Sequence, residues 1–79
     1  MTVTVRYYAR LKEEAGLSQE TVETDAATIS DLWKQLCDRH PFTLETRLIK
    51  AAQADEFCPW EAPLVRGALV VFMPPVAGG

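Results

Sequence analysis

The chain has 79 residues and a mass of 8.8 kDa, which suits one small domain and leaves little room for a deep substrate cavity. A hydrophobic content of 48% with 24% charged residues is typical of a globular domain and excludes a disordered chain. The net charge of -3 and the scattered arginines and lysines argue against nucleic acid as a partner.

Hydropathy along the chain gives no sign of a membrane protein. No apolar run approaches the roughly 20 residues of a membrane span, and no basic and apolar signal segment precedes the first strand pattern. We therefore expect a cytoplasmic protein that makes no membrane contact.

The first quarter of the chain predicts a strand, a short helix and a second strand. Apolar and polar residues alternate from Val3 to Tyr7, as in a strand with one buried face. Helix formers fill residues 9–15 and stop at Gly16, a residue that favours a left-handed helix end. Residues 18–24 carry the threonines and the valine of a solvent-facing second strand.

The main helix is predicted to begin after Thr28, whose side chain can cap the first turn, and to end before Pro41. His40 lies where that helix ends and has no evident nucleophile beside it, so we interpret it as a helix-end residue. Apolar residues at helical spacing form a single stripe that must lie on a sheet. The stripe consists of Ile29, Leu32, Trp33, Leu36 and Cys37.

The second half of the chain predicts two further strands. Residues 48–53 form the third, residues 54–63 contain two prolines and are loop or edge material, and residues 68–73 form the strongest strand after a turn at Arg66-Gly67. The order β-α-β-α-β-β indicates an α+β domain with a mixed sheet packed on one main helix.

The two cysteines do not indicate a metal centre. Cys37 and Cys58 lack the nearby histidine pair or second Cys-x-x-Cys that a zinc site requires. In a reducing compartment a structural disulfide is also unexpected. We therefore expect two free thiols and no bound metal.

The last strand is apolar on both faces, although one helix can cover only one face of the sheet. Val70 and Phe72 alternate with Leu69, Val71 and Met73. An uncovered apolar face indicates a partner, and cover by a loop carrying Phe57 or Trp60 is the alternative. The candidate docking residues are Leu69, Val71, Phe72 and Met73, and the two-residue period allows only one set to face outward.

Pro74 and Pro75 end this strand because they supply no backbone donors, and they stiffen the chain in an extended direction. Val76, Ala77, Gly78 and Gly79 follow. Small side chains and then two glycines let an extended backbone enter a narrow channel and bring a bare terminal carboxylate to another active site. We expect a domain over residues 1–75 and a flexible Gly-Gly tail over residues 76–79.

The ending Phe72-Met73-Pro74-Pro75-Val76-Ala77-Gly78-Gly79 resembles the Phe-Phe-Pro-Pro-Val-Ala-Gly-Gly typical of the small subunits of molybdopterin synthase. The segments at residues 7–16, 48–53 and 62–64 are similar to the same family, so the resemblance spans essentially the whole chain. Gln53 stands where the family usually has asparagine, and Arg66-Gly67-Ala68 replaces an acidic turn. The resemblance implies a ubiquitin-like β-grasp fold.

The resemblance also implies a function. The Gly79 carboxylate would be adenylated by an activating enzyme that uses ATP, converted to a thiocarboxylate, and inserted into the large catalytic subunit to donate sulfur to cyclic pyranopterin monophosphate. Pro74 to Gly78 would guide the insertion, within a heterotetramer. The chain itself would bind no cofactor and supply no acid or base.

Three alternatives remain open on the sequence. The chain is a sulfur carrier for thiamine or tRNA thiolation, a ubiquitin-like protein modifier joined through Gly79 to lysines, or an interaction module with an idle tail. Deleting Gly78 and Gly79 would leave the function of an interaction module unchanged, whereas it would abolish sulfur transfer by a carrier.

Overall fold

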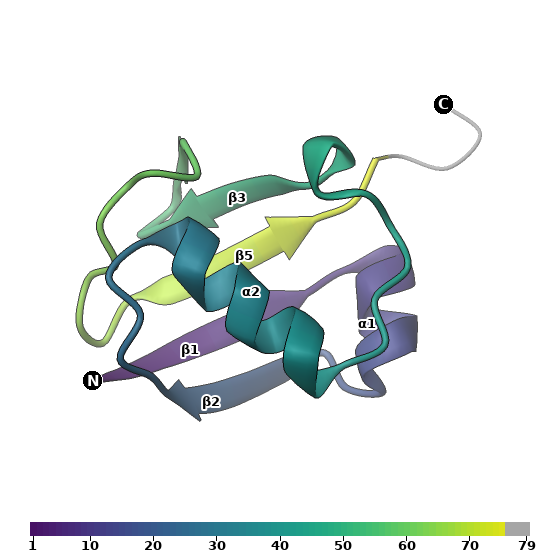
Figure 1. Cartoon of the computed structure of the whole chain (residues 1–79), viewed down its shortest axis with the longest axis horizontal. Coiled ribbons are helices and arrows are strands. Elements are labelled where there is room, and N and C mark those ends of the chain that lie inside the picture. Colours follow the sequence, from purple (N-terminus) through teal and green to yellow (C-terminus); the bar gives the residue numbers. More distant parts are fainter. Residues whose placement is uncertain (76–79) are drawn as a thin grey trace.

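Residues 1–75, which the computed structural model describes, form a mixed sheet with α2 across one face and α1 beside the end where β1 and β5 finish (Figure 1). The strands are β1 (Thr2–Tyr7), β2 (Gln19–Glu23), β3 (Lys50–Gln53), β4 (Glu56–Cys58) and β5 (Leu69–Met73). The helices are α1 (Ala9–Ala15), α2 (Ile29–Arg39) and the 3-10 helix η1 (Thr46–Leu48). The strand order is β2-β1-β5-β3-β4, with β1 and β5 parallel and the other pairs antiparallel. The predicted α+β class is confirmed.

α1 ends and α2 begins as their sequences predict. Gly16 has a left-handed φ of 79° and donates its backbone N–H to Lys12 O. The Thr28 hydroxyl accepts a hydrogen bond from Asp31 N at 3.1 Å, which satisfies a free donor of the first turn of α2.

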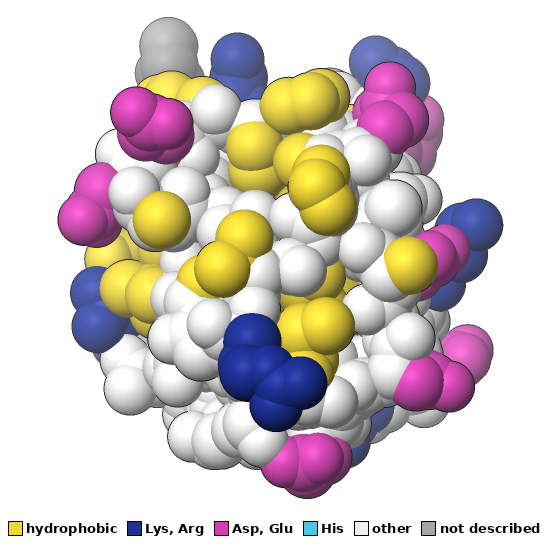
Figure 2. All heavy atoms as spheres, turned by 90° about the vertical axis from the view of Figure 1, so that its left-hand side faces the viewer, with side chains coloured by type: hydrophobic (Ala, Val, Ile, Leu, Met, Phe, Trp, Pro, Cys, Tyr) yellow, Lys and Arg dark blue, Asp and Glu magenta, His cyan; other side chains and the backbone are white. Residues whose placement is uncertain are grey.

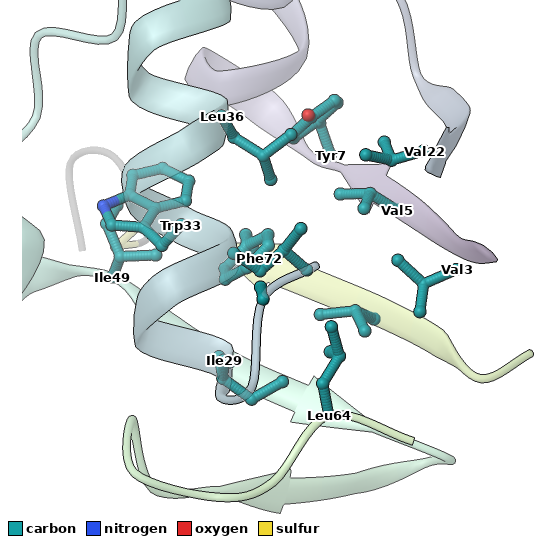
Figure 3. Packing of buried hydrophobic residues seen from close by; sticks show 14 of the residues in the cluster. Val3, Val5, Tyr7, Val22, Ile29, Trp33, Leu36, Ile49, Leu64 and Phe72 are labelled. Carbon is teal, nitrogen blue, oxygen red and sulfur yellow. The ribbon is translucent and has the colours of Figure 1, made fainter. Parts of the chain in front are cut away.

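The core lies between α2 and the sheet, and Figure 3 shows the side chains that meet there. Four residues of the predicted stripe are buried, but Cys37 is exposed, so its inclusion was wrong. At about 100° per residue, Cys37 lies about 80° around the helix from Ile29, at the edge of the stripe. The largest fully buried side chains are Tyr7, Phe72, Leu11, Ile29, Leu32, Leu36, Val3, Val5 and Val70.

The third strand begins two residues later than predicted, and the segment after it contains an edge strand. Residues 46–48 turn as η1, in which Ile49 N donates to Thr46 O at 3.0 Å. β3 and β4 are joined by a two-residue turn with left-handed φ values of 53° at Ala54 and 69° at Asp55. Positive φ at both central residues defines a type I′ turn, which favours asparagine and glycine.

We expect Ala54→Asn to raise the free energy of unfolding by about 0.5–1 kcal/mol, because asparagine tolerates the left-handed conformation that alanine resists. Urea denaturation measures the change. Ala27→Asn is the matched control, since Ala27 is exposed and does not have a positive φ. Equal effects of the two substitutions would contradict a gain that comes from the turn.

A hydrogen-bonded cluster around Glu20 joins β2 to the ends of β1 and α2. Its carboxylate accepts from the Tyr7 hydroxyl at 2.6 Å and from Arg39 Nη1 at 3.0 Å, and His40 Nε2 lies 2.7 Å from Glu20 Oε2. Burial raises the pKa of Glu20, but the hydrogen bonds from Tyr7, His40 and Arg39 outweigh burial and hold that pKa below its usual value. His40 thus has a structural partner at the end of α2.

The lowered pKa of Glu20 predicts an acid-sensitive part of the stability. A carboxyl group whose folded pKa lies below its unfolded pKa stabilises the fold above the unfolded pKa, and this contribution is lost as the pH falls through the folded pKa. We expect Glu20→Gln to cost about 1–3 kcal/mol at neutral pH and to have a smaller effect in acid. Urea titrations at both pH values measure this difference, which a pH-independent cost would contradict.

Candidate functional site: the open face of the C-terminal strand

β5 lies in the middle of the sheet and separates two chemically different faces. Val70 and Phe72 have no exposed surface and point into the core, whereas Leu69, Val71 and Met73 are half-buried on the face that α2 does not cover, here called the open face.

Phe72 was therefore wrongly included among the docking residues. Its ring packs in the core with centroid distances of 4.8 Å to Trp33 and 5.9 Å to Trp60. The two-residue period of β5 permits one outward set, and that set is Leu69, Val71 and Met73.

A groove of about 610 Å³ crosses the open face. Its centre is a row of three paired residues, because Val71 pairs with Ala52 and Ala52 pairs with Phe57. Phe57 is 71% exposed and forms a wall without closing the groove, while Trp60 packs against Phe72 on the other face. Neither aromatic side chain covers the open face. The groove is lined by Tyr8, Ala9, Ala52, Asp55, Phe57, Val71, Met73, Pro74 and Pro75.

The open face is divided into an apolar half and a polar half. The apolar half comprises the groove on β5, β3 and β4. The register of β1 and β2 places only polar side chains on the rest of the face, namely Thr2, Thr4, Arg6, Gln19, Thr21 and Glu23. This division restricts the apolar docking surface to one side of the sheet.

Sequence reasoning missed several groove residues because their proximity depends on strand order. Tyr8 follows β1, and Asp55 and Phe57 belong to the β3–β4 hairpin. Sequence reasoning named Phe57 only as a possible cover of this face, and the signal that could have placed it in the groove is an isolated aromatic residue in a short polar edge segment.

The segment that leads out of the fold starts from this groove. β5 ends where Met73 pairs with Lys50, and Pro74 and Pro75 then line the groove. The proposed tail residues Val76, Ala77, Gly78 and Gly79 lie outside the described residues. The site can therefore be described up to Pro75.

Gln53, a departure from the resembled family, makes contacts within the chain. Its Nε2 donates to Pro63 O at 3.0 Å, and its Oε1 accepts from Val65 N at 2.8 Å. The side chain thus fastens the end of β3 to the loop that precedes β5.

The structure offers no metal centre or activated thiol within residues 1–75. That part of the chain holds no group of three or more metal-ligating side chains. Burial raises the pKa of the Cys37 and Cys58 thiols, which disfavours the reactive thiolate. Within the same range, no helix has the length and hydrophobicity to cross a membrane.

Comparison with known proteins places this fold and site in a family. The ThiS family model matches residues 5–79. The molybdopterin synthase sulfur carrier subunit of Escherichia coli (strain K12) is 30% identical over 98% of this chain and 99% of its own. The crystal structure of SAMP1 from Haloferax volcanii superposes with a TM-score of 0.84 at 27% identity over 100% of both chains.

A candidate molybdopterin converting factor subunit 1 from Pyrococcus furiosus superposes with a TM-score of 0.79 at 26% identity, over 96% of this chain and 99% of its own. These likenesses confirm the β-grasp fold expected from the sequence and the resemblance to the small subunits of molybdopterin synthase. The chain belongs to the ThiS family.

Proposed function

We propose that this chain is the sulfur carrier subunit of a molybdopterin synthase and acts in the cytoplasm. The observation that carries the proposal is that β5 lies in the apolar half of the open face and leads directly, through Pro74 and Pro75, to Gly78 and Gly79 in the sequence. The near full-length similarity to the Escherichia coli sulfur carrier subunit supports the same assignment.

The chemistry starts from a carboxylate, which must be activated because oxide is a prohibitively poor leaving group. An oxygen of the Gly79 carboxylate attacks the α-phosphorus of ATP on an activating enzyme, and pyrophosphate leaves. A persulfide sulfur then attacks the carbonyl carbon and displaces AMP. A thiol cleaves the resulting S–S bond and leaves a thiocarboxylate on Gly79.

Transfer requires the large catalytic subunit. In the proposed complex, Leu69, Val71 and Met73 dock against that subunit, and Pro74 and Pro75 direct the tail through Val76, Ala77 and Gly78 into its active site. Docking would hold the thiocarboxylate sulfur beside cyclic pyranopterin monophosphate, which raises its effective concentration. The dithiolene needs two sulfurs, so carriers are exchanged or recharged, and a heterotetramer would hold two of them.

The test is the intact mass of the protein purified from its native cells with an untagged C-terminus. The expected result is a species in which sulfur replaces one oxygen of Gly79, copurified with a larger subunit. Carboxylate alone, in cells with high demand for the cofactor, would contradict the proposal.

A protein modifier is the second candidate, favoured by the likeness to SAMP1, whose full name is small archaeal modifier protein 1. In that case the activated Gly79 carbonyl forms an isopeptide bond with a lysine amine. The measurement is an immunoblot with an antibody against this chain. Conjugates that vanish when Gly79 is deleted would favour the modifier, and their absence would favour the carrier.

A further inference from the structure

We propose that the open face also pairs with the open face of a second copy of this chain, in one defined orientation. This inference does not depend on the proposed function. It starts from the apolar half of the face, where Phe57 is 71% exposed and Tyr8 is 45% exposed beside the half-buried Val71 and Met73. Such a surface favours association whenever the large subunit is absent.

The charges on the open face are separated along the strand direction. Lys50 pairs with Met73, so this cation lies at the end of the face that leads to Pro74, whereas Arg6 pairs with Val71 and lies level with the central row of the groove. The Arg6 guanidinium binds the neutral Gln19 side chain at 2.9 Å. No ion pair within residues 1–75 involves Arg6 or Lys50.

The anions of the open face lie at its other end. Asp55 sits in the turn after β3 and lines the groove, and Glu23 pairs with Thr2 at the beginning of β1. Figure 2 looks onto the molecule from this direction and shows both acidic and basic side chains around a group of hydrophobic ones. The face therefore has a positive end, an apolar half and a negative end.

Two-fold symmetry selects one way of stacking two such faces. An axis in the plane of the interface and perpendicular to the strands places β3 over β3 and reverses its direction, so apolar half meets apolar half. Lys50 then faces the second copy's Asp55, and the symmetry repeats this contact on the other side of the axis. An axis parallel to the strands would either place the apolar half over the polar half of β1 and β2 or, if it ran along β3, set Lys50 against the second copy's Lys50 and Asp55 against its Asp55.

The pairing has a functional consequence. A homodimer of this kind buries Val71 and Phe57, so it hides the surface that the large subunit would use. Self-association and docking on the large subunit would then compete for the same surface. The homodimer would also shield the apolar groove from contact with other proteins.

The experiment is sedimentation equilibrium of the full chain over a wide range of protein concentration. We expect a monomer–dimer equilibrium that Val71→Glu abolishes and that Lys50→Glu weakens at least about tenfold, because the substitution sets a carboxylate against Asp55 of the second copy. Lys34→Glu on α2 is the matched control and should leave the equilibrium unchanged, since Lys34 is exposed on the face opposite the groove. A chain that stays monomeric, or equal effects of Lys50→Glu and Lys34→Glu, would overturn the proposal.

A charge swap tests the orientation. Asp55→Lys alone should also weaken self-association, because it sets two cations against each other. An equimolar mixture of the Lys50→Glu and Asp55→Lys chains should dimerise. In the mixed dimer, contacts between opposite charges replace the like-charge contacts that each variant makes with itself. Failure of this mixture of folded chains to dimerise would overturn the orientation. Neither sulfur transfer nor the large subunit enters the measurement, so it succeeds or fails separately from the proposed function.

Discussion

Deleting Gly79 is expected to reduce sulfur transfer at least about a hundredfold, because the chain then ends one residue, or about 3.5 Å, short of the reacting position. The shortened chain still ends in a glycine carboxylate, so the loss would come from reach and not from the chemistry of the terminal group. The measurement is the rate of product formation by the reconstituted synthase with chemically prepared thiocarboxylate.

The deletion should leave the fold unchanged, because β5 ends at Met73 and Gly79 lies beyond it. Ala77→Gly is the matched control, since it alters the same segment but keeps its length and its terminal glycine. Undiminished transfer by the shortened chain would show that the terminal position does not set the reach, and the insertion mechanism would have to be abandoned.

Val71→Glu is expected to weaken binding of the large subunit at least about a hundredfold, or about 3 kcal/mol. Val71 lies in the central row of the groove with Ala52 and Phe57. A carboxylate at this position would lose its hydration in the complex, which weakens binding even where the carboxylate pairs with the neighbouring Arg6. Isothermal titration calorimetry with the purified large subunit measures the change.

The polar half of the same face supplies the control. Thr21 is exposed on β2 and pairs with Thr4, and Thr21→Glu should change the affinity little. Circular dichroism verifies that both variants are folded. If Val71→Glu binds as tightly as Thr21→Glu, the large subunit does not dock on the groove.

Elements with a strong local pattern could be predicted from the sequence. The stripe of α2, its Thr28 cap and its end before Pro41 depend on neighbours within a few residues. The same is true of the alternation in β1 and the left-handed Gly16. These features are decided by local geometry, which sequence periodicity reports directly.

The candidate site could be predicted only in part, because it depends on pairing between distant segments. The apolar character of β5 on both faces was evident, but the alternation alone could not tell whether Phe72 or Val71 faced the helix. Placing Phe57 in the same row as Val71, with Ala52 between them, requires the order β5-β3-β4 and the register of β3. Tyr8 reaches the groove only because β1 runs parallel to β5.

The parallel pairing of β1 with β5 bears on how the molecule is made. These two strands come from opposite ends of the chain, and β5 fills the gap between β1 and β3. During synthesis on the ribosome, the sheet cannot close until its final strand has emerged, so native contacts form late and over long sequence distances. A chain truncated before β5 lacks its central strand as well as its terminal glycines. Under the proposed function, only a completed and folded molecule would therefore present the C-terminal segment to an activating enzyme.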